Sequence, residues 1–325
     1  MVLQIPDKWV WDFWFAQDGL DYHIFFLQAS RKLKEENLRH WHVSIGHAIS
    51  QDLINWEILP DALSPSGEEN AWDNYTTWTG SVIHHAGTWY MFYTGANRAE
   101  GGKIQRIGVA ISTDLTNWHK HSDNPIIEAD PQWYETLDSA MWDDQAWRDP
   151  WVFYHNGIFH AYITARIKTG HKYSRGVIGH ARSTNLLNWE VSSPVTEPGE
   201  FGFLEVPQLV EIKGRWYLFF SALHDLYSET RRSRPGANLE TGTHYFVADH
   251  PLGPFEFLTN EFLVGDKIGS LYSGKVIRNP QGEWVYMAFR GKGPDNRFVG
   301  ELIDPVPVTI AQDGKISVCL RQLIS

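Results

Sequence analysis

The sequence has a single cysteine, no excess of basic residues and no long apolar run. Cys319 cannot form a disulfide within the chain, so stability has to come from packing, and a reducing compartment suits the protein. No stretch approaches the roughly 18 uninterrupted apolar residues of a membrane helix. Residues 1–11, which include Asp7 and Lys8, lack the apolar core of a secretory signal. We therefore expect a cytoplasmic protein with no signal peptide and no membrane partner.

Basic residues are scarce relative to acidic ones. The chain has 28 Lys and Arg against 39 Asp and Glu, a formal net charge of −11 with neutral histidines. Nucleic-acid binding draws most of its affinity from Lys and Arg that neutralise phosphates, so we expect no nucleic-acid partner. Aromatic residues are abundant, with 16 Trp, 13 Tyr and 17 Phe, and 42% apolar residues is ample for a buried core.

A repeated pattern organises the chain. Ile-Gly-x-Ala-x-Ser-x-Asx-Leu-x-Asn-Trp occurs at residues 45–56, 107–118 and 178–189. Each copy indicates a short strand, a turn at Ser and Asp or Asn, and a second strand that begins at Asn-Trp. A further strand precedes each copy, and two more units lack the Asn-Trp ending; these five strands lie at 21–27, 87–93, 157–163, 214–220 and 282–289.

Five units of about four strands each predict an all-β fold, a five-bladed β-propeller in which each blade is a four-stranded antiparallel sheet. Because no linker interrupts the units, we expect residues 1–325 to form one propeller domain without a C-terminal β-sandwich. Helical content should be slight, since no long stretch has a 3.6-residue period. The recurring Trp56, Trp118 and Trp189 should pack between blades rather than bind a ligand.

The first strand of each blade of a propeller lines the central channel, so polar residues at these strand starts can converge. The five units begin Trp11-Asp12-Phe13-Trp14, Trp78-Thr79-Gly80-Ser81, Trp147-Arg148-Asp149-Pro150, Leu204-Glu205-Val206-Pro207 and Tyr272-Ser273-Gly274. Three of them carry a carboxylate between large apolar residues, where burial is costly unless the group is paired or functional. Asp12, Asp149 and Glu205 are therefore the candidate catalytic residues.

Three convergent carboxylates suit glycoside cleavage. The reaction needs a proton donor for the leaving oxygen and a nucleophile or an activated water, and negative charge stabilises its oxocarbenium-like transition state. Asp12 and Glu205 fit the first two roles. Asp149, beside the cation Arg148, should stay ionised and hold sugar hydroxyls. Each carboxylate taken singly could equally satisfy backbone donors of the scaffold, but the three together favour function.

Other chemistries have weaker support. The fifteen histidines do not repeat a zinc pattern such as His-Glu-x-x-His, and no acidic loop indicates calcium, so we expect neither a metal nor another cofactor. A Gly-x-Ser-x-Gly elbow for a serine nucleophile is absent as well.

These motifs resemble those of the fructan-active glycoside hydrolases of family 32, which include invertases, levanases and inulinases, and of the related family 68 levansucrases. The stretch Trp41 to Leu63 is similar to the segment that follows the first active-site motif of family 32, and the Trp78, Arg148-Asp149-Pro150 and Glu205-Val206-Pro207 motifs follow in the family's order. Two motifs depart from the family. Asp12 lies in Trp-Asp-Phe-Trp, closer to family 68 than to Asn-Asp-Pro-Asn-Gly, and Val206 replaces the common cysteine after the acid.

The resemblance implies a catalytic propeller in which Asp12 is the nucleophile, Asp149 stabilises the transition state through the fructose hydroxyls and Glu205 is the general acid/base. The substrate would be a β-fructofuranoside such as sucrose or a fructan. The resemblance further implies substrate binding by Gln28, Trp41, Trp78, Ser81 and Arg148. We add Tyr272, at the start of the fifth unit, to this set.

Two alternatives stay open at the level of sequence. One is an inverting hydrolase similar to arabinanases and xylosidases, which would have its two carboxyl groups about 6.5–9.5 Å apart rather than about 5–5.5 Å. The other is a propeller that binds carbohydrate without cleaving it. The presence of all three acids favours an enzyme.

Overall fold

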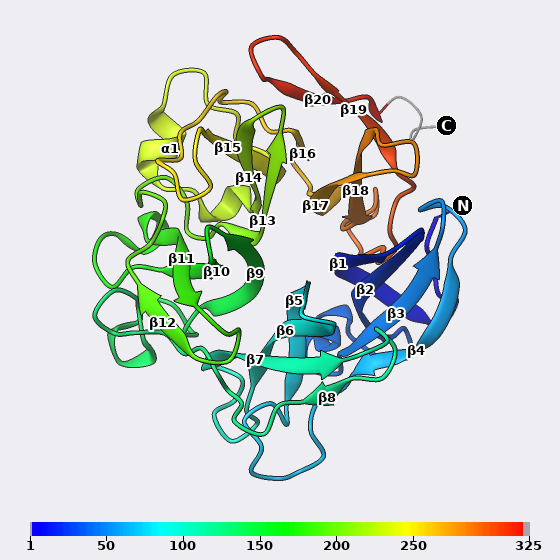
Figure 1. Ribbon diagram of the computed structural model, residues 1–325. Coiled ribbons are helices and arrows are strands. Elements are labelled where there is room, and N and C mark those ends of the chain that lie inside the picture. Colours follow the sequence, from blue (N-terminus) through cyan, green and yellow to red (C-terminus); the bar gives the residue numbers. More distant parts are fainter. Residues whose placement is uncertain (1, 321–325) are drawn as a thin grey trace.

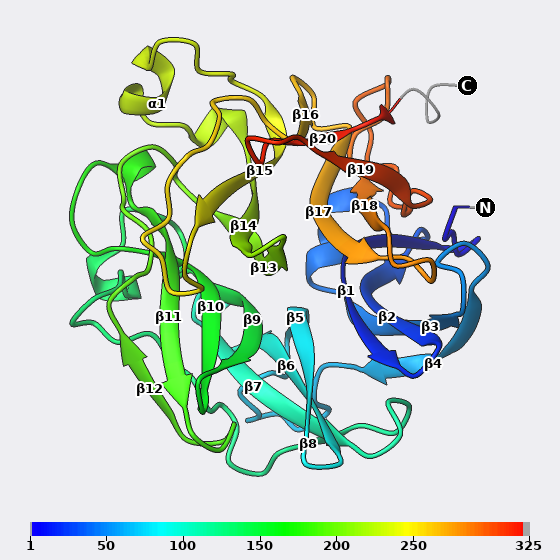
Figure 2. The ribbon, with the colours of Figure 1, turned by 45° about the horizontal axis from the view of Figure 1, so that its top comes forward.

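Five four-stranded antiparallel sheets form a ring around a central axis in the computed structural model, which describes residues 2–320 (Figures 1 and 2). In chain order the blades are β1 Lys8–Asp18, β2 Asp21–Ser30, β3 Ser44–Ser50 and β4 Glu57–Leu63; β5 Thr76–His85, β6 Thr88–Ala96, β7 Gln105–Ser112 and β8 His119–Lys120; β9 Trp147–His155, β10 Ile158–Arg166, β11 Gly176–Ser183 and β12 Trp189–Ser192; β13 Glu205–Ile212, β14 Arg215–Ala222, β15 Thr241–Ala248 and β16 Val264–Asp266; and β17 Leu271–Arg278, β18 Trp284–Arg290, β19 Val306–Ile310 and β20 Ile316–Val318. The predicted five-bladed propeller is confirmed. The ends of the predicted 1–325 domain, Met1 and residues 321–325, lie outside the described residues.

The ring closes where the first and last blades pack side by side (Figure 1). Every blade is built from consecutive strands, so no strand is exchanged between blade 1 and blade 5. Hydrogen bonds join these two blades instead: the Val10 amide donates to the Gly300 carbonyl at 2.9 Å, and Arg31 Nη2 donates to the Val299 carbonyl at 2.7 Å. Leu3 and Leu302 form an isolated antiparallel bridge at the same seam.

The repeated Ser-x-Asx-Leu-x-Asn-Trp pattern forms the same turn in three blades. Its leucine has a positive φ of 61° to 67° at Leu53, Leu115 and Leu186. The tryptophan after this turn packs against the preceding blade: Trp118 lies edge-on to Phe25 at 5.7 Å and Trp189 edge-on to Phe92 at 5.4 Å. The prediction that these repeated tryptophans belong to the packing between blades is confirmed for both pairs.

Helices are few and short. Within residues 2–320 the one α-helix is α1, Glu229–Ser233, and the four 3-10 helices are η1 Glu36–His40, η2 Leu137–Ser139, η3 Lys172–Ser174 and η4 His224–Leu226. None of the helices in this part of the chain is long and apolar enough to cross a membrane. Turns and loops between strands account for the remaining length.

The inner strand of each blade is interrupted near its start by a β-bulge. The pairing register of β1, β5, β9, β13 and β17 skips Asp12, Thr79, Asp149, Val206 and Ser273 respectively. Four of these residues have a positive φ, of 28° at Asp12, 58° at Asp149 and 52° at both Val206 and Ser273. A bulge redirects a side chain and stores backbone strain, and both features are typical of functional sites.

Candidate active site

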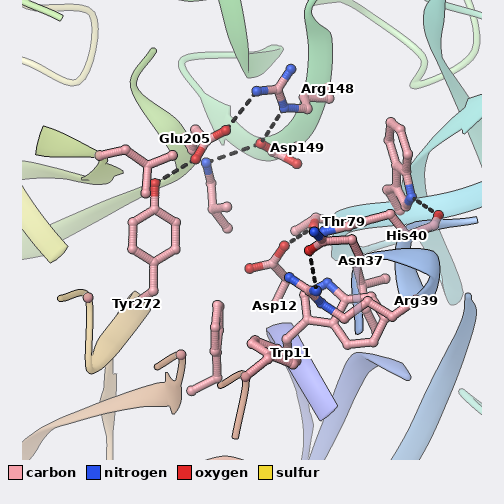
Figure 3. Close-up of a pocket in the computed structure, with 18 of the residues that line it drawn as sticks. Trp11, Asp12, Asn37, Arg39, His40, Thr79, Arg148, Asp149, Glu205 and Tyr272 are labelled. Atoms are coloured by element: carbon pink, nitrogen blue, oxygen red, sulfur yellow. Dashed lines mark hydrogen bonds and ion pairs between the residues drawn. The ribbon is translucent and has the colours of Figure 1, made fainter. Parts of the chain in front are cut away.

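A cavity of about 560 Å³ opens at the end of the channel where the five bulges lie. Asp12, Asp149 and Glu205 come from three different blades and face this cavity together (Figure 3). Seven of the nine residues predicted for the site line it: Asp12, Trp41, Trp78, Arg148, Asp149, Glu205 and Tyr272.

Glu205 is held by both of its oxygens. Arg148 Nη2 donates to Oε1 at 2.7 Å, and the Tyr272 hydroxyl donates to Oε2 at 2.5 Å (Figure 3). The guanidinium of Arg148 also has Nε 3.7 Å from Asp149 Oδ2. Burial opposes the charge of this guanidinium, but the surrounding carboxylates outweigh it and raise the pKa of Arg148. Arg148 is therefore a fixed cation between two of the three acids.

Asp12 accepts hydrogen bonds from the two neighbouring bulges. Thr79 Oγ1 donates to its Oδ2 at 3.1 Å, and the Ser273 hydroxyl donates to its Oδ1. Burial, followed by repulsion from Asp149 and Glu205, raises the pKa of Asp12 to about 7, although the two hydroxyls act in the opposite direction. The protein thus holds a carboxyl group that gains and loses its proton near neutral pH.

Asp149 is more enclosed. It is 6% exposed, and its Oδ2 accepts from Thr164 Oγ1 at 2.9 Å and from the Val206 amide at 3.2 Å. The sequence predicted that Arg148 keeps this carboxylate ionised. Burial is the larger effect and raises the pKa of Asp149, with Arg148 offsetting part of the shift. Arg148 instead makes its shorter contact with Glu205.

Two predicted binding residues, Gln28 and Ser81, lie outside the cavity lining, and their part in substrate binding stays a prediction. Gln28, on the second strand of blade 1, is 2% exposed and donates to Asp61 Oδ1 at 2.6 Å and to Ser44 Oγ at 3.2 Å. Ser81 lies further along β5 than the bulge, where it is 2% exposed and its Oγ accepts from the Val152 amide at 3.0 Å. Both side chains satisfy polar groups of the scaffold.

Sequence reasoning missed the loop between β2 and β3, which carries η1 and contributes to the cavity wall. Arg39 packs its guanidinium 3.9 Å from the centre of the Phe298 ring and donates from Nη1 to the Glu36 carbonyl at 2.8 Å. Burial lowers the pKa of Arg39 to about 10, while the charge of Asp12 acts in the opposite direction. The signal available in the sequence was the length of the segment between the first hairpin and Trp41.

A fourth carboxylate, Asp144, also lines the cavity and was not predicted. Gln105 Nε2 donates to its Oδ2 at 2.9 Å, and Gln105 Oε1 accepts from Arg148 Nη1 at 3.2 Å. Burial raises the pKa of Asp144. Its place four residues before Arg148 was visible in the sequence, but nothing there showed that the loop folds back over the channel.

Four of the fifteen histidines form two pairs within blades. His23 Nδ1 lies 2.8 Å from His47 Nε2 in blade 1, and His160 Nδ1 lies 2.9 Å from His180 Nε2 in blade 3. Among residues 2–320 no group of three His, Cys, Asp or Glu side chains is arranged to hold a metal ion.

Comparison with known proteins identifies relatives of this sequence and fold. Residues 13–297, a range that begins one residue after Asp12, match the model of the glycosyl hydrolases family 32 N-terminal domain. The sucrose-6-phosphate hydrolase of Bacillus subtilis (strain 168) is 26% identical over 275 residues, which are 82% of this chain and 51% of the relative. A 6(G)-fructosyltransferase from Asparagus officinalis is 33% identical over 140 residues, 37% of this chain and 21% of the relative.

The chain therefore spans about half the length or less of these curated relatives. Among solved structures, the inulosucrase from Halalkalicoccus jeotgali bound to kestose superimposes with a TM-score of 0.77 at 22% identity, over 97% of this chain and 87% of that one. This likeness shows a shared fold.

Proposed function

Since the chain belongs to glycosyl hydrolase family 32, we propose that it is a retaining hydrolase of β-fructofuranosides, such as sucrose, fructo-oligosaccharides or fructans. The observation that carries this proposal is the meeting of Asp12, Asp149 and Glu205 in one cavity, with Arg148 between two of them. A relative named as a sucrose-6-phosphate hydrolase and another named as a fructosyltransferase support fructosides as the substrate class.

Asp12 would be the nucleophile. Ionised Asp12 attacks the anomeric carbon of the fructosyl unit and forms a covalent ester while the bond to the leaving oxygen breaks. Thr79 and Ser273 each donate a hydrogen bond to one of its oxygens, which fixes the orientation of the carboxylate. Because its pKa is raised to about 7, the nucleophile is fully ionised only above neutral pH in the empty site.

Glu205 would be the general acid and then the general base. It protonates the departing oxygen in the first step and takes a proton from the attacking water in the second. Arg148 and Tyr272 hold its carboxyl group from two sides, so that one orientation serves both steps.

Asp149 and Arg148 would recognise the fructose ring. The guanidinium supplies fixed donors in a planar fork, and the carboxylate accepts from sugar hydroxyls. The bulge at Asp149 and the following Pro150 leave the ladder at this point, so the carboxylate can turn toward the cavity without breaking a paired strand. Trp41 and Trp78 would supply apolar wall on the blade 1 and blade 2 side of the ring.

The proposal is tested by measuring fructose released from sucrose, short inulin and levan. The test variant is Asp12→Asn, which keeps the shape of the side chain and should lower kcat by more than about a hundredfold, since losing the covalent route should raise the barrier by several kcal/mol. Release at a similar rate by the variant would contradict the assignment of Asp12. Binding of these sugars by the wild type without any release would indicate a carbohydrate-binding propeller.

A further inference from the structure

The proposed roles leave one buried cation of the channel unused. Lys275 follows the bulge of β17, is 2% exposed and is absent from the cavity lining. Its ammonium donates to the Val206 carbonyl at 2.7 Å, which is the one hydrogen bond it makes to the residues described. A buried lysine with a single neutral acceptor is costly unless negative charge lies nearby.

The acceptor of Lys275 belongs to the catalytic wall. Val206 is the bulge residue of β13, directly after Glu205, and its amide donates to Asp149 Oδ2 at 3.2 Å. Lys275 therefore binds, from blade 5, the one residue that both follows the proposed acid and donates to the proposed transition-state stabiliser. The Trp151 ring, 6.0 Å from the ammonium, provides an apolar neighbour on the blade 3 side.

Charge balance points to the same residue. Asp12, Asp149 and Glu205 bring three carboxylates to one enclosed space, and Arg148 bonds mainly to Glu205. Lys275 interacts electrostatically with Asp12 and Asp149, to which Arg148 donates no hydrogen bond. Burial lowers the pKa of Lys275 to about 7, and these two carboxylates act against that shift.

We propose that Lys275 is a positioning residue of the active site: its ammonium anchors the Glu205-Val206 bulge and supplies the positive charge that allows Asp12 and Asp149 to be ionised together away from water. The chemical part of this inference rests on the proposed function. The electrostatic part concerns the protein itself and can be measured without turnover.

The kinetic test compares Lys275→Met with Lys275→Arg. Loss of the cation should lower kcat by about tenfold or more with KM changed by less than about threefold, because the charge acts on the reacting carboxylates and does not touch the sugar. The acidic limb of the kcat/KM profile should move to higher pH by about one unit, since Asp12 becomes harder to ionise. Lys275→Arg should keep most of the wild-type kcat and the wild-type position of the acidic limb.

The control is Gln208→Met. Gln208 lies two residues after the bulge of β13, as Lys275 does in β17, and its amide pairs with the backbone of Val276 through Nε2 at 2.9 Å and Oε1 at 2.8 Å. The Gln208→Met variant should lower the free energy of unfolding without moving the acidic limb of the kcat/KM profile. The other charged or titratable groups around the cavity are unchanged in all variants: Arg39, His40, Asp144, Arg148, Glu205, Tyr272 and Lys292.

The second readout is independent of activity. In protein labelled with ¹³C at the aspartate carboxyl carbon, the Asp12 resonance is assigned as the one missing from Asp12→Asn, and its titration should move to higher pH in Lys275→Met. If that variant does not fold, Lys275→Gln, which keeps a polar donor without the charge, takes its place. An unchanged Asp12 titration overturns the inference, as does equal loss of kcat in Lys275→Arg. A shifted titration in a protein that releases no fructose supports the electrostatic role while rejecting the proposed function.

Discussion

The hydroxyl of Tyr272 donates to Oε2 of Glu205 at 2.5 Å, on the side of the carboxyl group opposite to Arg148. The two donors come from the residues that precede the bulges in blades 5 and 3, so three neighbouring inner strands contribute one residue each to a single chain of contacts. For Glu205 to transfer a proton, the leaving oxygen has to share or replace one of these contacts. Tyr272 is the partner that carries no fixed charge and can be removed most cleanly.

Tyr272→Phe should therefore lower kcat for sucrose, by roughly ten- to a hundredfold, because the carboxyl group loses the contact that orients it. The ring still packs against Phe289, whose centroid lies 6.0 Å away, so the fold should be retained. A fructoside with a good leaving group should be affected much less, since its departure needs little protonation. Equal losses for both substrates would place Tyr272 in sugar binding instead. Steady-state kinetics on the two substrates make this distinction.

Asp12→Asn should stabilise the protein at neutral pH while it removes activity. Asp12 has a pKa raised from 3.8 to about 7, so the native state binds its proton more tightly than the unfolded chain does. The stability contributed by that proton is complete below about pH 3.8 and is lost as the pH rises toward 7. The gain in unfolding free energy for Asp12→Asn should thus grow across this window, to the order of a few kcal/mol. Urea denaturation at pH 4.5 and 7.5 tests it; a constant difference would contradict the shift.

Ser81→Ala should lower the free energy of unfolding and leave KM for sucrose within about twofold of the wild-type value. Ser81 Oγ is the acceptor for the buried Val152 amide, which links blade 2 to blade 3, and an orphaned buried amide costs about 1–3 kcal/mol. Denaturant unfolding and kinetics on the same preparation separate the two effects. A large rise in KM with an unchanged free energy of unfolding would indicate that Ser81 binds the sugar.

The contrast between the three acids on one side and Gln28 and Ser81 on the other shows what a sequence pattern can predict. The five repeats align the starts of the inner strands, and these starts face the axis in every blade, with Asp12 and Asp149 at the bulges and Glu205 one residue before a bulge. Asp12, Asp149 and Glu205 could be found in this way because a radial repeat converts spacing along the chain into position around the ring. The sequence did not show that Gln28 and Ser81 lie outside the cavity lining. A motif gives the order of residues along the chain but does not show whether a side chain ends in the cavity or in the packing behind it.

Features that depend on loops or on burial were beyond the sequence for a physical reason. Arg39 and Asp144 reach the cavity through irregular segments whose path follows no period. The raised pKa of Asp149 results from burial by several blades, and a neighbouring arginine in the chain is a poor guide to it. Lys275 occurs in an ordinary strand pattern, and its relation to Val206 exists only after β13 and β17 are brought together.

The histidine pairs should make the protein lose stability in mild acid. Burial lowers the pKa of His160 and His180 to about 4, from about 6.5, so both are neutral in the native state. Groups with a depressed pKa contribute stability above about pH 6.5, and it is lost as the pH falls toward 4. Blade 2 has Tyr90 and Val109 at the corresponding places of the repeat.

The double variant His160→Tyr/His180→Val, which copies blade 2, should therefore show a smaller loss of unfolding free energy between pH 7 and pH 5 than the wild type. The difference should be on the order of 2 kcal/mol for each histidine removed. Denaturant unfolding at the two pH values measures it. If both proteins lose the same amount of unfolding free energy, the His160–His180 pair does not govern acid stability.

Methanol should act as an acceptor and give methyl β-D-fructofuranoside. A retaining enzyme forms an ester on Asp12 in the first step, and that ester can be attacked by any small nucleophile that reaches the anomeric carbon from the side on which Glu205 serves as base. Two inversions at the same carbon return the β configuration. An inverting hydrolase has no such ester, because water attacks directly as the leaving group departs. Methyl fructoside should thus accumulate in proportion to methanol concentration, with its anomeric configuration read by ¹³C NMR, and Asp12→Asn should form none. Fructose release without any methyl fructoside, or with the α anomer as product, would contradict a covalent intermediate on Asp12 and favour the inverting alternative.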